Sequence, residues 1–320
     1  MQLHLHRHGR LLNVLDLSPC AYHRPVNGSR GRTRQRGRQA TSQRLALTVI
    51  ATLVCGSAVV GAGGAARSAP TGDEDRPPPR TSFRLGGEDH GRTLLHLRGA
   101  VDGRTVTDAS GAANHGRLVT GRGGGVVSAR SGSHNRYLRF TGASCSRGRG
   151  CPWAVLAVRA GRDPEGGDDG APAFAFGAWV RLTAEPGRAG MTVIRRGTAD
   201  DGEAHWSLEV DDKRVSCRWS DGEDSVVLPD DLGRSVALEL GHWYALSCAR
   251  HGSRFVLTVT DPVSAWPLGT YHHVAEDIGP DRPRGPITVG AGADGPLRAG
   301  TDRVTAPFHG DLDEVMVRSG

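Results

Sequence analysis

Short segments in which every second residue is apolar recur from Thr93 to the C-terminus. In residues 204–210, Trp206, Leu208 and Val210 share one side of an extended segment, and polar residues occupy the other side. Clusters of Gly, Pro, Asp and Asn separate these segments, and no amphipathic pattern of three helical turns is apparent. The pattern predicts an all-β domain in which strands bury one face each.

The same alternation gives the positions of the expected strands. They are residues 93–97, 137–140, 153–158, 174–182, 191–196, 204–210, 214–219, 242–249, 254–260, 286–289 and 308–317. So many short strands predict two packed sheets, and the 46 glycines fit the tight turns between them. The tryptophans within these segments are predicted to lie in the core, namely Trp153, Trp179, Trp206, Trp219 and Trp243.

The formal net charge of +6 is concentrated at the N-terminus. Residues 1–44 hold nine arginines and one acid, Asp16, while residues 45–66 hold no charge. Of the 40 basic and 34 acidic residues, 31 and 33 therefore remain in the rest of the chain. Because the remainder has no clustered basic patch, nucleic acid is not an expected partner.

The uncharged segment 45–66 follows Arg44 directly and ends in small residues, which is the order of a signal peptide cleaved near Ala66. The alternative is an uncleaved anchor helix, since its 22 residues would span about 33 Å of a hydrocarbon core of about 30 Å. We expect a leader at 1–66, an unstructured proline-rich linker at 67–82 and one domain at 83–320. The predicted location is extracellular, with cell-surface anchoring through 45–66 as the alternative and the only expected membrane contact.

Four cysteines remain after the leader, Cys145, Cys151, Cys217 and Cys248. An even number in an exported chain predicts two disulfides. We favour Cys145–Cys151, which closes a short glycine-containing loop, and Cys217–Cys248, since each of these two lies on the apolar face of a strand. A zinc site would need closely spaced cysteine pairs, which the chain lacks.

Seven motifs in order resemble the laminin-G-like jelly-roll domain of the concanavalin A-like lectin and glucanase superfamily. They are residues 94–97 (LLHL), 108–116 (DASGAANHG), 137–142 (YLRFTG), 174–180 (FAFGAWV), 206–210 (WSLEV), 242–246 (HWYAL) and 308–315 (FHGDLDEV). The resemblance implies a two-sheet sandwich whose loops or concave face bind glycans, proteins or calcium.

Some members of that superfamily hydrolyse polysaccharides with two acids in a Glu-x-Asp-x-x-Glu strand. This chain has no such spacing, and residues 142–146 lack the last glycine of a Gly-x-Ser-x-Gly nucleophile motif. We therefore expect an extracellular, non-catalytic domain that binds a carbohydrate or a cell-surface protein. A polysaccharide hydrolase and a structural or adhesive surface module are the alternatives.

Two pairs of polar residues are candidates for a calcium site, Asp108 with Asn114 and Asp311 with Asp313. Carboxylate and amide oxygens are the ligands that Ca²⁺ prefers, and calcium is the candidate cofactor. The favoured alternative is structural, with Asp108 in an Asx turn and Asp313 accepting backbone N–H groups. Asp311 and Asp313 are predicted to share a strand face, with Glu314 on the opposite one.

The candidate ligand-binding residues are Trp266, Tyr271 and His272, in a loop-rich stretch at 261–284. An aromatic ring there could stack on a sugar or a peptide, although packing of Trp266 at the edge of the sandwich is the favoured alternative. His272 and His273 would point to opposite sides of a strand, which argues against joint metal binding.

Overall fold

The computed structural model describes residues 92–131, 135–142, 151–159, 173–186, 190–198, 203–279, 283–293, 297 and 304–320. These residues belong to the compact unit Ala66–Gly320. The predicted leader, the proline-rich linker and Cys145 lie outside the described residues, so the proposed boundaries at 66 and 82 stay predictions.

Strands dominate the described residues. They are β1 (Arg92–Asp102), β2 (Thr105–Asp108), β3 (Gly116–Gly121), β4 (Gly125–Ser131), β5 (Asn135–Thr141), β6 (Trp153–Val158), β7 (Phe174–Leu182), β8 (Met191–Arg196), β9 (His205–Asp211), β10 (Arg214–Ser220), β11 (Ser225–Leu228), β12 (Trp243–His251), β13 (Arg254–Thr260), β14 (Pro267–Val274), β15 (Ile287–Val289), β16 (Gly292–Ala293), β17 (Val304–Thr305) and β18 (Gly310–Ser319). One 3-10 turn, η1 (Leu232–Arg234), is the helical element in these ranges. None of the described segments forms a helix with the length and apolar character that crossing a membrane requires.

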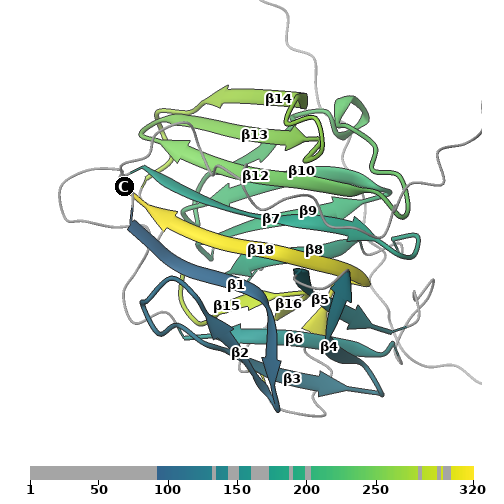
Figure 1. The fold of residues 1–320 in the computed structure, drawn as a ribbon. Helices are drawn as coiled ribbons and strands as arrows, with labels where there is room; N and C mark the ends of the chain where they lie inside the picture. The colour runs from purple at the N-terminus through teal and green to yellow at the C-terminus, as the bar shows by residue number, and fades with distance from the viewer. Residues whose placement is uncertain are drawn as a thin grey trace, which may run out of the picture. The chain divides into compact units, whose positions relative to one another are not determined.

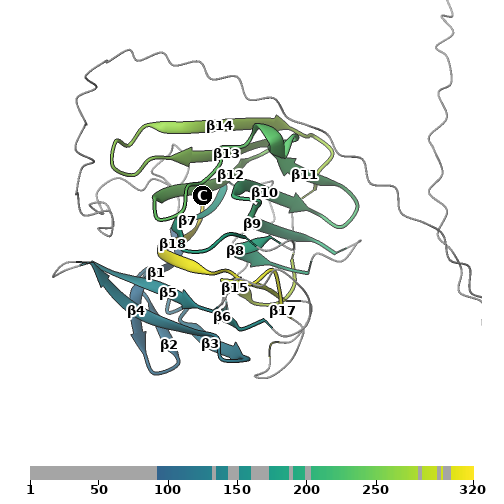
Figure 2. The same cartoon turned by 90° about the vertical axis from the view of Figure 1, so that its right-hand side faces the viewer.

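Most strands follow one hydrogen-bonded path that folds back on itself into two layers (Figure 1). Off this path, β5 pairs with β18 and with β4, and β16 and β17 form a separate two-stranded sheet. The front layer runs β1-β18-β7-β12-β13-β14, and the back layer runs β11-β10-β9-β8-β15-β6-β3, with β2 joining β3 to β1. Figure 2 shows the layers beside each other after a quarter turn. The predicted all-β sandwich of two packed sheets is confirmed.

The core between the layers is rich in aromatic rings. Trp206 of β9 packs against Phe176 of β7 with ring centroids 4.4 Å apart, and Trp219 of β10 packs against Phe255 of β13 at 5.1 Å. These residues lie on the alternating apolar faces that the sequence predicts, and each is fully buried. Burial of so much aromatic area is a main source of stability for a sandwich of this kind.

The other three tryptophans are buried outside this central core. Trp179 and Trp243 cluster with Tyr137 and Ala245 on the outer side of the front layer, and Trp153 packs in a separate cluster in the back layer. Their predicted burial is confirmed. The alternation of apolar residues could not show on which face of the sheet these tryptophans lie, because side chains on both faces are buried at these positions.

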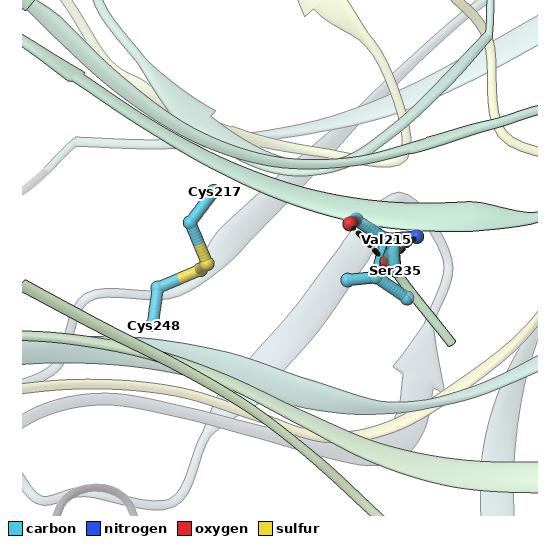
Figure 3. The surroundings of a disulfide bond; sticks show 4 residues. All are labelled: Val215, Cys217, Ser235 and Cys248. Carbon is cyan, nitrogen blue, oxygen red and sulfur yellow. Dashed lines mark hydrogen bonds between the residues drawn. A yellow bond between two sulfur atoms is a disulfide. The ribbon is translucent and has the colours of Figure 1, made fainter. Parts of the chain in front are cut away.

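A disulfide joins the two layers through Cys217 of β10 and Cys248 of β12 (Figure 3). Their Cα atoms are 6.0 Å apart, and both residues are fully buried. The Ser235 hydroxyl beside it donates to the Val215 carbonyl oxygen at 2.7 Å and accepts from the Val215 N–H at 3.1 Å. The predicted Cys217–Cys248 bridge is confirmed. The two hydrogen bonds of Ser235 also fix the segment after η1 to β10, the strand that carries Cys217.

Only one cysteine of the second predicted bridge lies within the described residues. Cys151 is disulfide-bonded, whereas Cys145 lies outside the described residues. The pairing of these two cysteines stays a prediction.

Strand β14 lies within the stretch 261–284, which was predicted to be loop-rich, and is absent from the predicted strands. Residues 267–274 form the edge strand beside β13, with Leu257 opposite Tyr271 and Val256 opposite His272. Most of β14 is exposed, so neither of its faces required a regular apolar pattern. The short strands β2, β3, β4, β11, β16 and β17 were missed as well, because each carries too few alternating apolar residues to be recognised.

His309 precedes β18 and is 4% exposed, and its two ring nitrogens make no hydrogen bond with the described residues. Gly142 lies against the ring, where an added Cβ would come within 2.8 Å of Nδ1. Burial lowers the pKa of His309 below its ordinary value of 6.5 because the charged imidazolium is poorly solvated there.

We expect the sandwich to lose stability as the pH falls below 6.5, since the unfolded chain then binds the proton that folded His309 excludes. Above that pH the contribution is fully present. His309→Leu should weaken the loss, measured as the melting temperature between about pH 7.5 and about pH 5. A remaining slope is expected from His205, whose pKa is also lowered by burial. Identical pH dependence of variant and wild type would contradict this assignment.

Candidate functional site

Two loops at one end of the front layer expose large apolar side chains. Residues 239–242 precede β12, and residues 261–266 connect β13 to β14. Since Ala245 pairs with Thr260, the start of β12 and the end of β13 lie at the same end of the sheet. The loop-end patch is defined by Leu240, Val263, Trp266 and Leu268, which are 41%, 81%, 74% and 49% exposed.

The loop that carries Trp266 is held by its own hydrogen bonds. The Asp261 carboxylate accepts from the Val263 N–H and the Ser264 hydroxyl, both at 2.9 Å. The Asp261 backbone donates to the Trp266 carbonyl oxygen at 3.1 Å and accepts from the Ala265 N–H at 2.8 Å. Trp266 therefore lies on an ordered turn. Binding of a ligand to Trp266 would cost little conformational entropy, because the loop is already ordered.

The structure places Tyr271, another predicted ligand-binding residue, in a supporting position. Its hydroxyl donates to the Arg234 carbonyl oxygen at 2.9 Å and accepts from the Val236 N–H at 3.0 Å. Its ring packs against the main core. Tyr271 thus fastens the η1 segment to β14, and its role in ligand binding stays a prediction.

His272 lies on the outer side of β14, opposite Val256, whereas His273 pairs with Phe255 on the core side. The register confirms that the two histidines point to opposite sides of the strand. The Nδ1 atom of His272 is 3.3 Å from a guanidinium nitrogen of Arg254, and both side chains are exposed. His272 therefore belongs to the outer surface of the front layer, on β14, the strand that directly follows Trp266.

The predicted calcium residues Asp108 and Asn114 are hydrogen-bonded to neighbouring segments. The Asp108 carboxylate accepts from the backbone N–H groups of His96, Ser110 and Asn114 and from the Ser110 hydroxyl, at 2.7–2.9 Å. The Asn114 side-chain amide donates to the Leu94 carbonyl oxygen at 2.7 Å. This arrangement matches the Asx turn that we predicted as the structural alternative to a calcium site. It fixes the 108–114 loop to β1.

Burial alone would raise the pKa of Asp108, but the hydrogen bonds from Ser110, His96 and Asn114 together lower it. In the ranges that the structure describes, no three His, Cys, Asp or Glu residues are grouped as a metal site would require. Calcium binding at Asp108 and Asn114, or at Asp311 and Asp313, stays a prediction.

Asp311 of β18 is fully buried between two arginines. The Arg139 Nε atom lies 2.8 Å from Oδ1, and an Arg181 guanidinium nitrogen lies 2.7 Å from Oδ2. The Arg181 guanidinium also stacks on the rings of Tyr137 and Trp243, 5.4 and 5.1 Å from their centroids. The cluster joins β5, β7, β12 and β18.

The prediction that Glu314 faces away from Asp311 and Asp313 is wrong. A register shift between Asp313 and Met316 marks a β-bulge, and Glu314 adopts a positive φ of 48°. The extra residue places its carboxylate on the outer side, where it contacts His96 at 2.5 Å and Arg98 at 3.1 Å. Strict alternation fails here because a bulge adds one residue to the strand.

No family model matches the sequence, and no curated protein matches it. Solved structures give weak likenesses. They include the binding domain of Paraclostridial mosquitocidal protein 1 (12% identity, TM-score 0.42, covering 71% of this chain and 48% of that chain), the botulinum neurotoxin serotype D binding domain (10%, 0.43, 71% and 47%) and the LG1-3 region of the laminin alpha2 chain (13%, 0.36, 51% and 28%). This chain spans about half or less of the length of those chains.

Proposed function

We propose that this chain is an extracellular, non-catalytic recognition domain of the laminin-G-like jelly-roll type, which binds a glycan or a cell-surface protein through the loop-end patch. One observation carries the proposal. Trp266 is 74% exposed on a turn that is fixed by its own hydrogen bonds. Leaving so large an apolar ring in water is unfavourable, and exposed apolar patches of this kind mark binding surfaces.

The chemistry of the patch suits both classes of ligand. A tryptophan ring stacks on the apolar face of a sugar or accepts a side chain of a protein partner, and tryptophan is among the residues that dominate binding energy at interfaces. Val263 and Leu268 extend the apolar surface on either side of Trp266 in sequence.

Two further features support an extracellular binding role. The Cys217–Cys248 bridge is typical of proteins that fold in an oxidising compartment, and the 45–66 segment has the order of an export signal. The acid spacing of the superfamily's hydrolases is missing from the sequence, which supports a domain that binds without cleaving.

Trp266→Ala in the full chain is expected to weaken ligand binding by about thirtyfold, which corresponds to about 2 kcal/mol for an interfacial tryptophan. Binding would be measured on a glycan array and on intact cells, and the affinity for any retained ligand by titration. Val127→Ala is the matched control, since Val127 of β4 is 47% exposed outside the patch and should leave affinity unchanged. Equal binding by the wild type and Trp266→Ala, or cleavage of a bound polysaccharide, would refute the proposal.

A further inference from the structure

Strand β14 ends the hydrogen-bonded path of the front layer, and Figure 1 and Figure 2 show it at the margin of the sheet. Among the described strands, only β13 pairs with it. Just after the strand, the Ala275 N–H donates to the Ser253 carbonyl oxygen at 2.9 Å. Because the direction of the backbone groups alternates along a strand, Thr270, His272 and Val274 direct their N–H and carbonyl groups away from β13. The outer edge of β14 thus offers a regular row of backbone donors and acceptors.

This edge lacks the features that usually protect an exposed strand. Proteins blunt sheet edges with charged side chains, proline, bulges or very short strands. In β14, Pro267 and a bulge beside Leu268 lie at the start, and residues 269–274 hold no Asp, Glu, Lys or Arg. The other end of the path is protected, because β11 has only four residues and follows Glu223 and Asp224. The contrast indicates that the edge of β14 pairs with a further strand.

We propose that β14 pairs antiparallel with β14 of a second copy of this chain, so that the two front layers form one continuous sheet. In a two-fold register centred on Tyr271, Thr270 of each copy lies opposite His272 of the other, and each such pair exchanges two hydrogen bonds. The same register brings Leu268 of one copy beside Val274 of the other. These apolar side chains are 49% and 63% exposed, and the pairing removes both from water. The strand is therefore complementary to itself.

The charges on β14 favour this register over its neighbour. With Tyr271 at the centre, His272 lies opposite Thr270 and His273 lies opposite Gly269, so no histidine meets its own copy. A register centred on His272 would set the two His272 rings opposite each other, and a guanidinium nitrogen of Arg254 already lies 3.3 Å from each ring. Like charges directly opposite each other destabilise a strand pair.

The first test compares His272→Pro with His272→Ala in the full chain, by sedimentation velocity over a concentration series. Wild type is expected to pass from monomer to dimer as its concentration rises. Proline removes the outward N–H from each copy, so two hydrogen bonds are lost and the dimer dissociation constant should rise about thirtyfold or more. His272→Ala keeps the N–H and should dimerise like wild type. The melting temperature of dilute, monomeric His272→Pro should stay close to that of wild type, since proline is tolerated where an edge strand's N–H faces solvent.

A pair of double variants tests the register. Leu268→Lys/Val274→Lys places like charges beside each other at both ends of the ladder and should give a monomer, whereas Leu268→Lys/Val274→Glu places opposite charges there and should dimerise. Both side chains are exposed in the single copy, so neither double variant removes a core contact.

Three results would overturn the inference. They are a wild type that stays monomeric at every concentration, equal dimerisation of His272→Pro and His272→Ala, and equal dimerisation of the two lysine-containing double variants. The inference goes beyond the proposed function and is tested separately from it. Trp266 precedes β14, so Trp266→Ala should dimerise like wild type even though it weakens ligand binding.

Discussion

Replacing Cys217 and Cys248 together with alanine is expected to lower the free energy of unfolding by about 4 kcal/mol. The bridge joins residues 31 apart in sequence and ties the two layers together, so it restricts the unfolded chain over a long loop. Its burial in the core adds a smaller loss from the space left by the missing sulfurs. Urea unfolding followed by tryptophan fluorescence would measure the change.

The same titrations under reducing conditions provide the control. Reductant should destabilise the wild type strongly and the double alanine variant only slightly, with any remaining effect due to the bridge of Cys151. A wild type and a variant with equal stability in oxidising buffer would show that the bridge does not constrain the sandwich.

Asp311→Ala is expected to destabilise the fold by about 3–5 kcal/mol, the range for removing one partner of a buried ion pair. Arg181 is only 4% exposed, so its guanidinium would stay in the interior without the carboxylate that it contacts at 2.7 Å. Arg139 contributes less to the loss, because its side chain is 41% exposed and can be solvated. Thermal and urea unfolding would measure the effect.

Glu185→Gln is the matched control for this substitution. It removes an ion pair with Lys213 of similar length, 3.2 Å, but both side chains are well exposed, so the expected loss is below about 1 kcal/mol. Similar losses for the two variants would mean that the Asp311 cluster is solvated and does not hold the four strands together.

The loop-end patch was only partly predictable from the sequence. The sequence offers Trp266 as a candidate ligand contact and favours its packing at the sandwich edge, and the favoured packing is wrong, because the side chain is 74% exposed. Leu240 comes from a different loop, and only the pairing of β12 with β13 places that loop at the same end of the sheet. Nothing in the sequence near Leu240 indicates that its loop lies at the same end of the sheet as Trp266.

Local alternation in the sequence predicts the inner faces of the sandwich and favours the disulfide that crosses it, and the structure confirms both. Alternation along β9, β10 and β12 specifies which side chains enter the core, because a strand has a period of two and one buried face must be apolar. The features of the outer faces depend on the tertiary structure, namely the buried Arg181–Asp311 cluster and the bulge that turns Glu314. These features depend on which distant strands become neighbours and in which register, and that information is not contained in the local pattern of any one strand.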